Sequence, residues 1–192
     1  MTDSKKQVVE QIKKEIQEEL AEASKDARHL EAVMSHIDNV QKSCMKLAKR
    51  LMEDEETYDV GFKLLKNSYL HDNSKFDGIE WEFLRTPNLI KDGSCKDEAE
   101  RKKCFLLALD QHQRTNMHHP EYWGDIKLMP PEYLAEMVCD WNSRSMEFGT
   151  DLREWIKKEV PEKWGASSSS KAYREIMKFV NTLLDPTFKK GK

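Results

Sequence analysis

Histidine and aspartate are the residues of this sequence whose spacing could support chemistry. Three of the six histidines fall within eight residues of one another: His112, His118 and His119. His71 directly precedes Asp72, and His36 lies beside the apolar face of a predicted helix. Imidazole nitrogens and carboxylate oxygens hold divalent metals in hydrolytic and redox sites. The pattern predicts a metal centre. The alternatives are a buried structural histidine at His36 and a histidine-rich surface loop at residues 112–119.

A buried acid is the second candidate feature. The segment from Glu136 to Trp141 places two carboxylates on a helix with an apolar face. A carboxylate at the border of such a face costs free energy unless it is paired, hydrogen-bonded or bound to metal. Asp140 is therefore a candidate metal ligand, with an ion pair to Arg144 as the alternative. The helical phase does not decide whether Asp140 or Glu136 is the buried acid.

The elements that must position these residues are predicted to be helices. Apolar residues recur at three- and four-residue steps over 4–24, 30–51, 97–115 and 173–184, and shorter helices are expected near 60–70, 131–141 and 151–160. Residues 86–96 are predicted to form a loop, Pro161 is expected to end a helix, and the serine run 167–170 is either a flexible linker or a cluster of N-caps. No alternating strand pattern occurs, so the predicted fold class is all-α.

Three parts are expected along the chain. Residues 1–28 form a polar helix, residues 29–148 a metal-binding helical core, and residues 149–192 C-terminal helices joined by the serine-rich linker. The polar helix has a narrow apolar stripe, so it either lies across the domain or mediates a contact between subunits of a homodimer.

Composition limits the class of protein. The 192 residues include 32 Lys and Arg and 35 Asp and Glu, which gives a formal charge of −3. A duplex DNA binder needs clustered basic residues to neutralise phosphates, and no such block occurs. No apolar run of about 18 residues predicts a membrane span, and the first residues lack the apolar core of a signal peptide. With four scattered cysteines that suit free thiols, we expect a cytoplasmic protein.

The order of His36, His71-Asp72 and Asp140 resembles the H…HD…D signature of the HD-domain superfamily of metal-dependent phosphohydrolases. In that superfamily a five-helix core brings one His, a His-Asp pair and a distant Asp around a divalent ion. The resemblance implies that His36, His71, Asp72 and Asp140 bind a metal, within a core from about residue 29 to residue 148. Their separations, 35 residues from His36 to His71 and 68 from Asp72 to Asp140, are similar to those of small bacterial 5′-deoxynucleotidases.

Lys75 stands where those nucleotidases usually have Glu. The resulting HD-x-x-K is more similar to the cyclic-dinucleotide phosphodiesterase and di-iron oxygenase branches. Their additional histidines imply a second metal on His112 with His118 or His119, although the spacing differs and their Gly-rich stretch is missing. The resemblance is most specific to an uncharacterised family of phage and bacterial proteins with no established activity. That family shares HD-x-S-K-F at 71–76, H-Q-x-x-N-x-H-H-x-E-Y-W at 112–123 and E-M-x-x-D-W at 136–141.

These resemblances imply a metal-dependent phosphohydrolase that acts on a nucleotide or another small phosphate ester through a metal-activated water. One or two ions of Mn, Co, Zn, Mg or Fe are expected, in the cytosol of a bacterium or of a phage host. Lys75 would neutralise phosphate charge, Arg114 would clamp phosphate, and His118 or His119 would protonate the leaving oxygen. Glu121 would either orient a ligating histidine or contact the substrate. The expected substrate-binding residues are Asn116, Glu121, Tyr122, Trp123 and Arg144. The alternatives are a di-iron oxygenase and a non-enzymatic helical protein, such as a phage protein with a host partner, that has a structural metal site.

Overall fold

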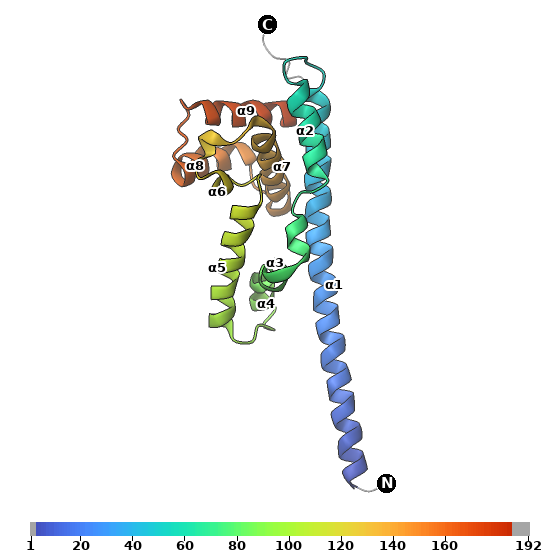
Figure 1. Cartoon of the computed structure of the whole chain (residues 1–192). Coiled ribbons are helices and arrows are strands. Elements are labelled where there is room, and N and C mark those ends of the chain that lie inside the picture. The colour runs from blue at the N-terminus through green and yellow to red at the C-terminus, as the bar shows by residue number, and fades with distance from the viewer. Residues whose placement is uncertain (1–2, 186–192) are drawn as a thin grey trace. The chain divides into compact units, whose positions relative to one another are not determined.

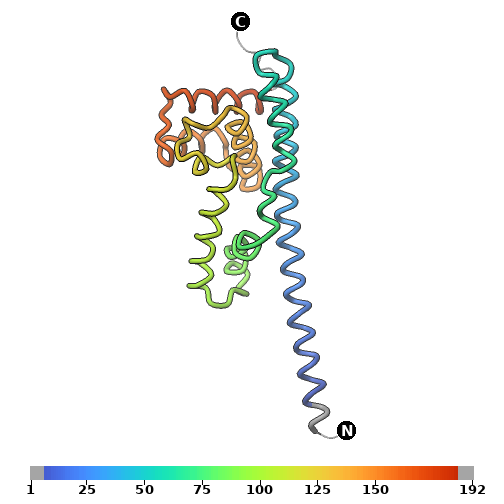
Figure 2. Tube along the Cα trace, viewed as in Figure 1, coloured from blue at the N-terminus to red at the C-terminus, as the bar shows by residue number. Residues whose placement is uncertain are grey.

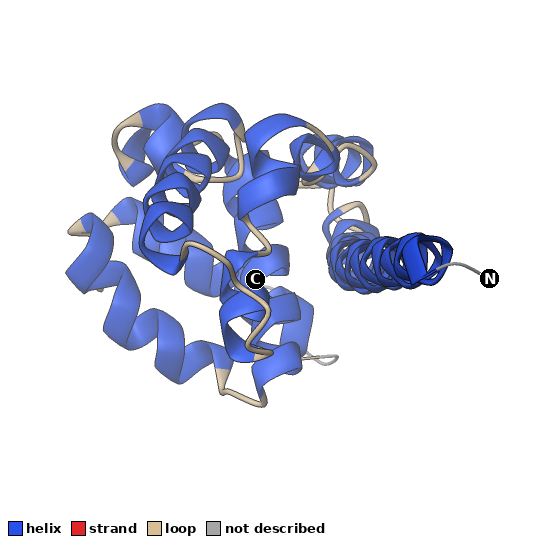
Figure 3. Cartoon of the chain, turned by 90° about the horizontal axis from the view of Figure 1, so that it is seen from below, coloured by secondary structure: helices blue, strands red, loops and turns tan. Residues whose placement is uncertain are grey.

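The computed structural model describes residues 3–185, with side chains from residue 7 onward, and this part of the chain contains helices and no strand (Figures 1 and 3). The all-α prediction is confirmed. The α-helices are α1 (Asp3–Leu51), α2 (Tyr58–Ser68), α3 (Gly78–Phe83), α4 (Thr86–Lys91), α5 (Glu98–Thr115), α6 (Pro120–Trp123), α7 (Pro131–Phe148), α8 (Leu152–Trp164) and α9 (Lys171–Leu184). Two 3-10 helices are η1 (Asn73–Phe76) and η2 (Ile126–Leu128). Among the described residues, no helix is both long and apolar enough to cross a membrane.

The chain divides into two compact units. The boundary between them, after Ser35 and before His36, falls inside helix α1. This boundary lies seven residues after the predicted one at residue 28. The sequence predicted two helices, 4–24 and 30–51, where the structure has a single one. Residues 25–29 contain neither Gly nor Pro, and Arg28 bonds to Ser24 one turn earlier, so the helix continues.

The hydrophobic core lies in the second unit. Helix α2 turns back along the C-terminal part of α1, which Figure 2 traces. Helix α7 packs against both α2 and α9. Fully buried side chains from four helices fill the space between them: Leu47, Leu64, Val138, Ile176 and Phe179. The C-terminal helices therefore complete the same core that supports α7.

The structure changes two local predictions and decides a third. Residues 86–91 form α4 in the segment predicted as a loop, and its proline occupies the first turn, where a missing N–H is tolerated. Pro161 lies inside the last turn of α8 and does not end it; Gly165, in the left-handed conformation, ends it instead. The serine run ends in an N-cap, because the Ser170 hydroxyl accepts a bond from the backbone N–H of Tyr173.

Candidate metal centre

Four imidazoles converge on one carboxylate. The Nε2 atoms of His36 and His71 lie 3.4 and 3.5 Å from Oδ2 of Asp72. The Nε2 atoms of His112 and His118 lie 3.3 and 3.4 Å from its other oxygen, Oδ1. All five side chains are buried, and Asp72 is 1% exposed. The two oxygens of Asp72 therefore face two different pairs of histidines.

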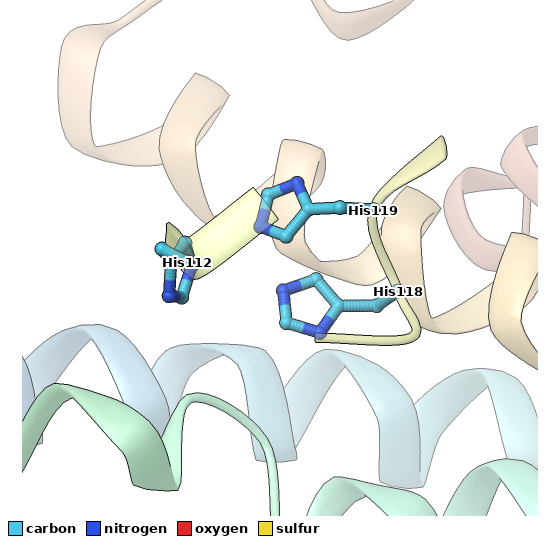
Figure 4. A group of neighbouring side chains, drawn as sticks. All are labelled: His112, His118 and His119. Atoms are coloured by element: carbon cyan, nitrogen blue, oxygen red, sulfur yellow. The ribbon is translucent and has the colours of Figure 1, made fainter. Parts of the chain in front are cut away.

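Each pair gains a further candidate ligand. Oδ1 of Asp140 lies 3.1 Å from His36 Nε2, so Asp140 joins the first pair. His119 joins the second pair, since ligand atoms of His112, His118 and His119 lie within 4.8 Å of one another. Figure 4 shows these three rings gathered between α5 and the segment that follows it. We call His36, His71 and Asp140 the first set and His112, His118 and His119 the second set, with Asp72 between them.

The atoms that face one another in the two sets lack hydrogen-bond partners. This applies to Nε2 of His36, His71, His118 and His119 and to Oδ1 of Asp72 and Asp140. Buried polar atoms are almost always hydrogen-bonded in folded proteins, so a group of six is unusual. These atoms come from different elements and make no hydrogen bond to one another. The residues thus fit bound divalent cations, which would satisfy them all.

Glutamates hold the outer nitrogens of three of these rings. Nδ1 of His36 donates to Glu147 at 3.0 Å, and Nδ1 of His71 donates to Glu136 at 3.0 Å. Nδ1 of His112 donates to the buried Glu80 at 2.7 Å. A carboxylate only accepts, so each bond fixes the proton on Nδ1 and leaves Nε2 free to bind metal. Such carboxylate partners are typical of histidines that ligate metal ions.

The acids and bases of the cluster shift one another's pKa values. Burial opposes protonation of His36, but the carboxylates of Asp140 and Asp72 outweigh it and raise the pKa of His36 to about 9. Without a metal, Nε2 of His36 therefore carries a proton at neutral pH, and a bound cation would displace that proton. Burial favours the neutral acid at Asp72, yet His71 and Lys75 hold the pKa of that carboxyl well below its usual range. Asp72 is therefore ionised, with cationic groups around it. A carboxylate must be ionised to bind a metal.

His119 differs from the other histidines. Burial, together with the neighbouring His118 and His112, lowers the pKa of His119 to about 2. Its imidazole is therefore neutral at physiological pH and keeps a lone pair. That state suits metal ligation. Proton donation by His118 or His119 stays a prediction.

Residues 25–186 match the model of a family of unknown function, DUF5662. The chain belongs to this family. All the candidate ligands and their glutamate partners lie inside the matched residues. Searches of curated proteins and of solved structures found no match.

Local structure explains how the DUF5662 chain assembles the cluster. Asp72 follows the end of α2 in the left-handed conformation, with φ of 56°, which Asp tolerates better than most residues. Glu136, Asp140 and Glu147 are spaced by four and seven residues along α7, so they lie along one side of it. His36 comes from α1, and the last turn of α5 supplies His112.

Lys75 and Asn116, which were also predicted as site residues, lie beside the cluster. The Lys75 ammonium forms an ion pair with Oδ2 of Asp72. The Asn116 side chain donates to the Ser74 hydroxyl at 3.0 Å, and Ser74 in turn donates to Glu80. Asn116 thus supports the Glu80 partner of His112.

Arg144 lies at the edge of the cluster of the DUF5662 chain. Its guanidinium pairs with Glu147 at 2.9 Å, and Glu147 holds His36. Arg144 therefore pairs with Glu147 and not with Asp140, although an Arg144–Asp140 ion pair was the predicted alternative to metal ligation.

Four predicted residues are not brought to the cluster. Arg114 is 66% exposed and pairs with Asp110 on the surface of α5. Glu121 accepts a bond from the Trp164 indole instead of orienting a ligating histidine. The Trp123 indole donates to the carbonyl of Met117, and its ring packs beside Tyr133. Tyr122 lies against Trp123 and is partly exposed.

Glu80 and Glu147 were not predicted as site residues from the sequence, and the choice between Glu136 and Asp140 stayed open. Glu136 and Asp140 are both buried, so burial does not choose between them. They differ in their partners, because Glu136 contacts the outer nitrogen of His71 and Asp140 contacts the inner nitrogen of His36. The seven-residue step from Asp140 to Glu147 on α7 is a signal that could have identified Glu147. Glu80 lies 32 residues from its partner His112, and no local pattern connects the two.

Proposed function

We propose that this protein is a metal-dependent phosphohydrolase of the HD-domain type that uses two divalent ions. The observation that carries the proposal is the placement of Asp72, whose two oxygens face separate pairs of histidines at 3.3–3.5 Å. A carboxylate between two nitrogen-rich sets is suited to bridge two cations. The first set with Asp72 would hold one ion, and the second set with Asp72 the other.

The formal charge of the cluster favours two ions and an anionic substrate. Glu147 is neutralised by Arg144, which leaves four carboxylates and one ammonium in contact with the ligands. These groups are Asp72, Glu80, Glu136, Asp140 and Lys75, with a formal charge of −3. One divalent ion would leave the site at −1 and repel a phosphate, whereas two bring it to +1 and attract one.

Each residue of the cluster then has a definite task. Bound ions would activate water near neutral pH and polarise a phosphoryl oxygen. The glutamates keep the rings of His36, His71 and His112 in one orientation, with Nε2 toward the metal positions. Lys75, partly buried beside Asp72, offers the ammonium closest to the ligands to a negatively charged substrate.

The test is a measurement of metal content followed by a phosphatase screen. Protein purified without chelator should contain about two transition metals per chain by plasma mass spectrometry. Phosphate release is then screened over nucleoside mono-, di- and triphosphates, cyclic dinucleotides and sugar phosphates with Mn, Co, Mg and Fe. Turnover that disappears with chelator and returns with metal supports the proposal. Full metal content with no release from any phosphate ester would overturn it.

A second function is favoured by one group of residues. His71, Asp72 and His118 form a set of two histidines and one carboxylate within 4.8 Å. This combination is typical of non-haem iron oxygenases. If the protein is an oxygenase, the iron-loaded form consumes dioxygen in the presence of a small organic substrate and the manganese form releases no phosphate.

A further inference from the structure

Glu136 differs from the other two glutamates because it contacts both sets. Its Oε1 lies 3.0 Å from Nδ1 of His71, in the first set, and 3.6 Å from Nδ1 of His118, in the second set. Glu147 contacts only His36, and Glu80 only His112, among the ligating rings. Within the described residues, Glu136 is therefore the only acid whose contacts join the two sets through the outer ring nitrogens.

The two contacts of Glu136 are unequal. A distance of 3.0 Å is a normal hydrogen bond, whereas 3.6 Å is longer than the usual limit of about 3.2 Å. Oε1 is thus hydrogen-bonded to His71 and lies close to His118 without a hydrogen bond to it. The two rings are adjacent, with centroids 4.3 Å apart. A cavity of about 230 Å³ borders His71, His118 and Glu136, so open space lies beside these residues.

We propose that Glu136 is a positioning residue that couples the two metal positions, so that loading of one raises the affinity of the other. This inference rests on the proposed two-ion function. A cation on the first set fixes His71 and, through it, the Glu136 oxygen. The fixed oxygen then accepts the Nδ1–H of His118 at normal length and aims its Nε2 at the second position. Coupling of this kind is reciprocal, and it typically changes affinity by about 5- to 150-fold.

The test compares three isosteric variants. Chelator-treated wild type, Glu136→Gln, Glu80→Gln and Glu147→Gln are titrated with Co²⁺, followed by visible absorption and by metal bound per chain. The amide of Gln is neutral and accepts more weakly than a carboxylate. Wild type should bind two Co²⁺ with positive cooperativity. Loss of a carboxylate partner of a ligating His typically lowers metal affinity by about 10- to 100-fold.

The three variants should affect different steps of Co²⁺ binding. Glu136→Gln should weaken both binding steps by about tenfold or more and abolish the cooperativity. Glu147→Gln should weaken one step and Glu80→Gln the other. Circular dichroism confirms folding, and Glu136→Asp, which keeps the charge and shortens the side chain, replaces the Gln variant if that one does not fold.

The outcomes separate this inference from the proposed function. If Glu136→Gln weakens a single step, or leaves cooperativity at the wild-type value, the coupling is refuted. Wild type that binds two ions cooperatively but releases no phosphate supports the coupling and refutes the hydrolase. Wild type that binds fewer than two ions refutes both.

Discussion

Replacement of Asp72 by Asn isolates the contribution of the shared carboxylate. Asn has nearly the same shape and accepts the left-handed conformation that Asp72 adopts, so the fold should be retained. The charge is lost, and one oxygen becomes an amide nitrogen. The first set keeps Asp140 as an anionic ligand, whereas the second set keeps only neutral histidines. We expect the second position to lose its ion and the first to bind more weakly.

The size of the effect follows from linkage between metal binding and folding. At a metal concentration of 100 times Kd, each ion stabilises the folded state by about 2.7 kcal/mol. Two ions give about 5.4 kcal/mol, and for a domain of this size each kcal/mol shifts the Tm by about 2–4 °C. Metal should therefore raise the Tm of wild type by roughly 11–22 °C. In Asp72→Asn, with at most one ion, the shift should fall to half of this or less.

The assay is thermal unfolding by circular dichroism with chelator and with Mn²⁺, paired with metal analysis of the same samples. Asp97→Asn is the matched control, because Asp97 also has a positive φ, of 51°, but is exposed at the start of α5 outside the cluster. The control should show the full wild-type shift. If Asp72→Asn binds two ions and shows the wild-type shift in Tm, the bridging role of Asp72 is wrong.

Three further predictions concern other residues. Arg114→Ala should leave metal content and phosphate release within about twofold of wild type, because Arg114 pairs with Asp110 on the surface, where such pairs contribute little. Lys75→Met should keep two ions per chain by metal analysis but lower phosphate turnover by about tenfold to a hundredfold, since it removes a charged hydrogen-bond donor beside the ligands. Gly61→Ala should lower the free energy of unfolding, measured in urea, by about 1–3 kcal/mol, because the added Cβ would lie 2.8 Å from the carbonyl oxygen of Ala48.

The convergence of the candidate ligands could be predicted because their residue types are informative by themselves. A His-Asp pair and a dense histidine cluster are rare enough in a polar helical chain to stand out, and the structure brings both around Asp72. The apolar periodicity of residues 30–51 also predicted a core helix, and Val40, Cys44 and Leu47 are fully buried there. Residue types and the period of the apolar residues were therefore enough to predict the fold class and most of the candidate ligands.

Arg114 shows what residue type alone misses. It lies two residues after His112 on α5, and at 3.6 residues per turn its side chain points about 200° away from that of His112. Asn116, four residues after His112, returns to the same side and contacts the cluster. A count of helical phase from the ligand would have excluded Arg114 and retained Asn116. Glu80 could not be found in this way, because only the packing of α3 against α5 brings it to His112.

Helix α7 connects the stability of the core to the chemistry of the site. Glu136, Asp140 and Glu147 lie within about 40° of one another around its axis. The adjacent Met137 and Val138 are buried in the core. The same helix thus supplies one candidate ligand, Asp140, and holds two candidate rings, His36 through Glu147 and His71 through Glu136. Divalent ions bound by these residues would favour the folded state, because the unfolded chain does not hold the same ligands together, so metal should stabilise the core that α7 supports.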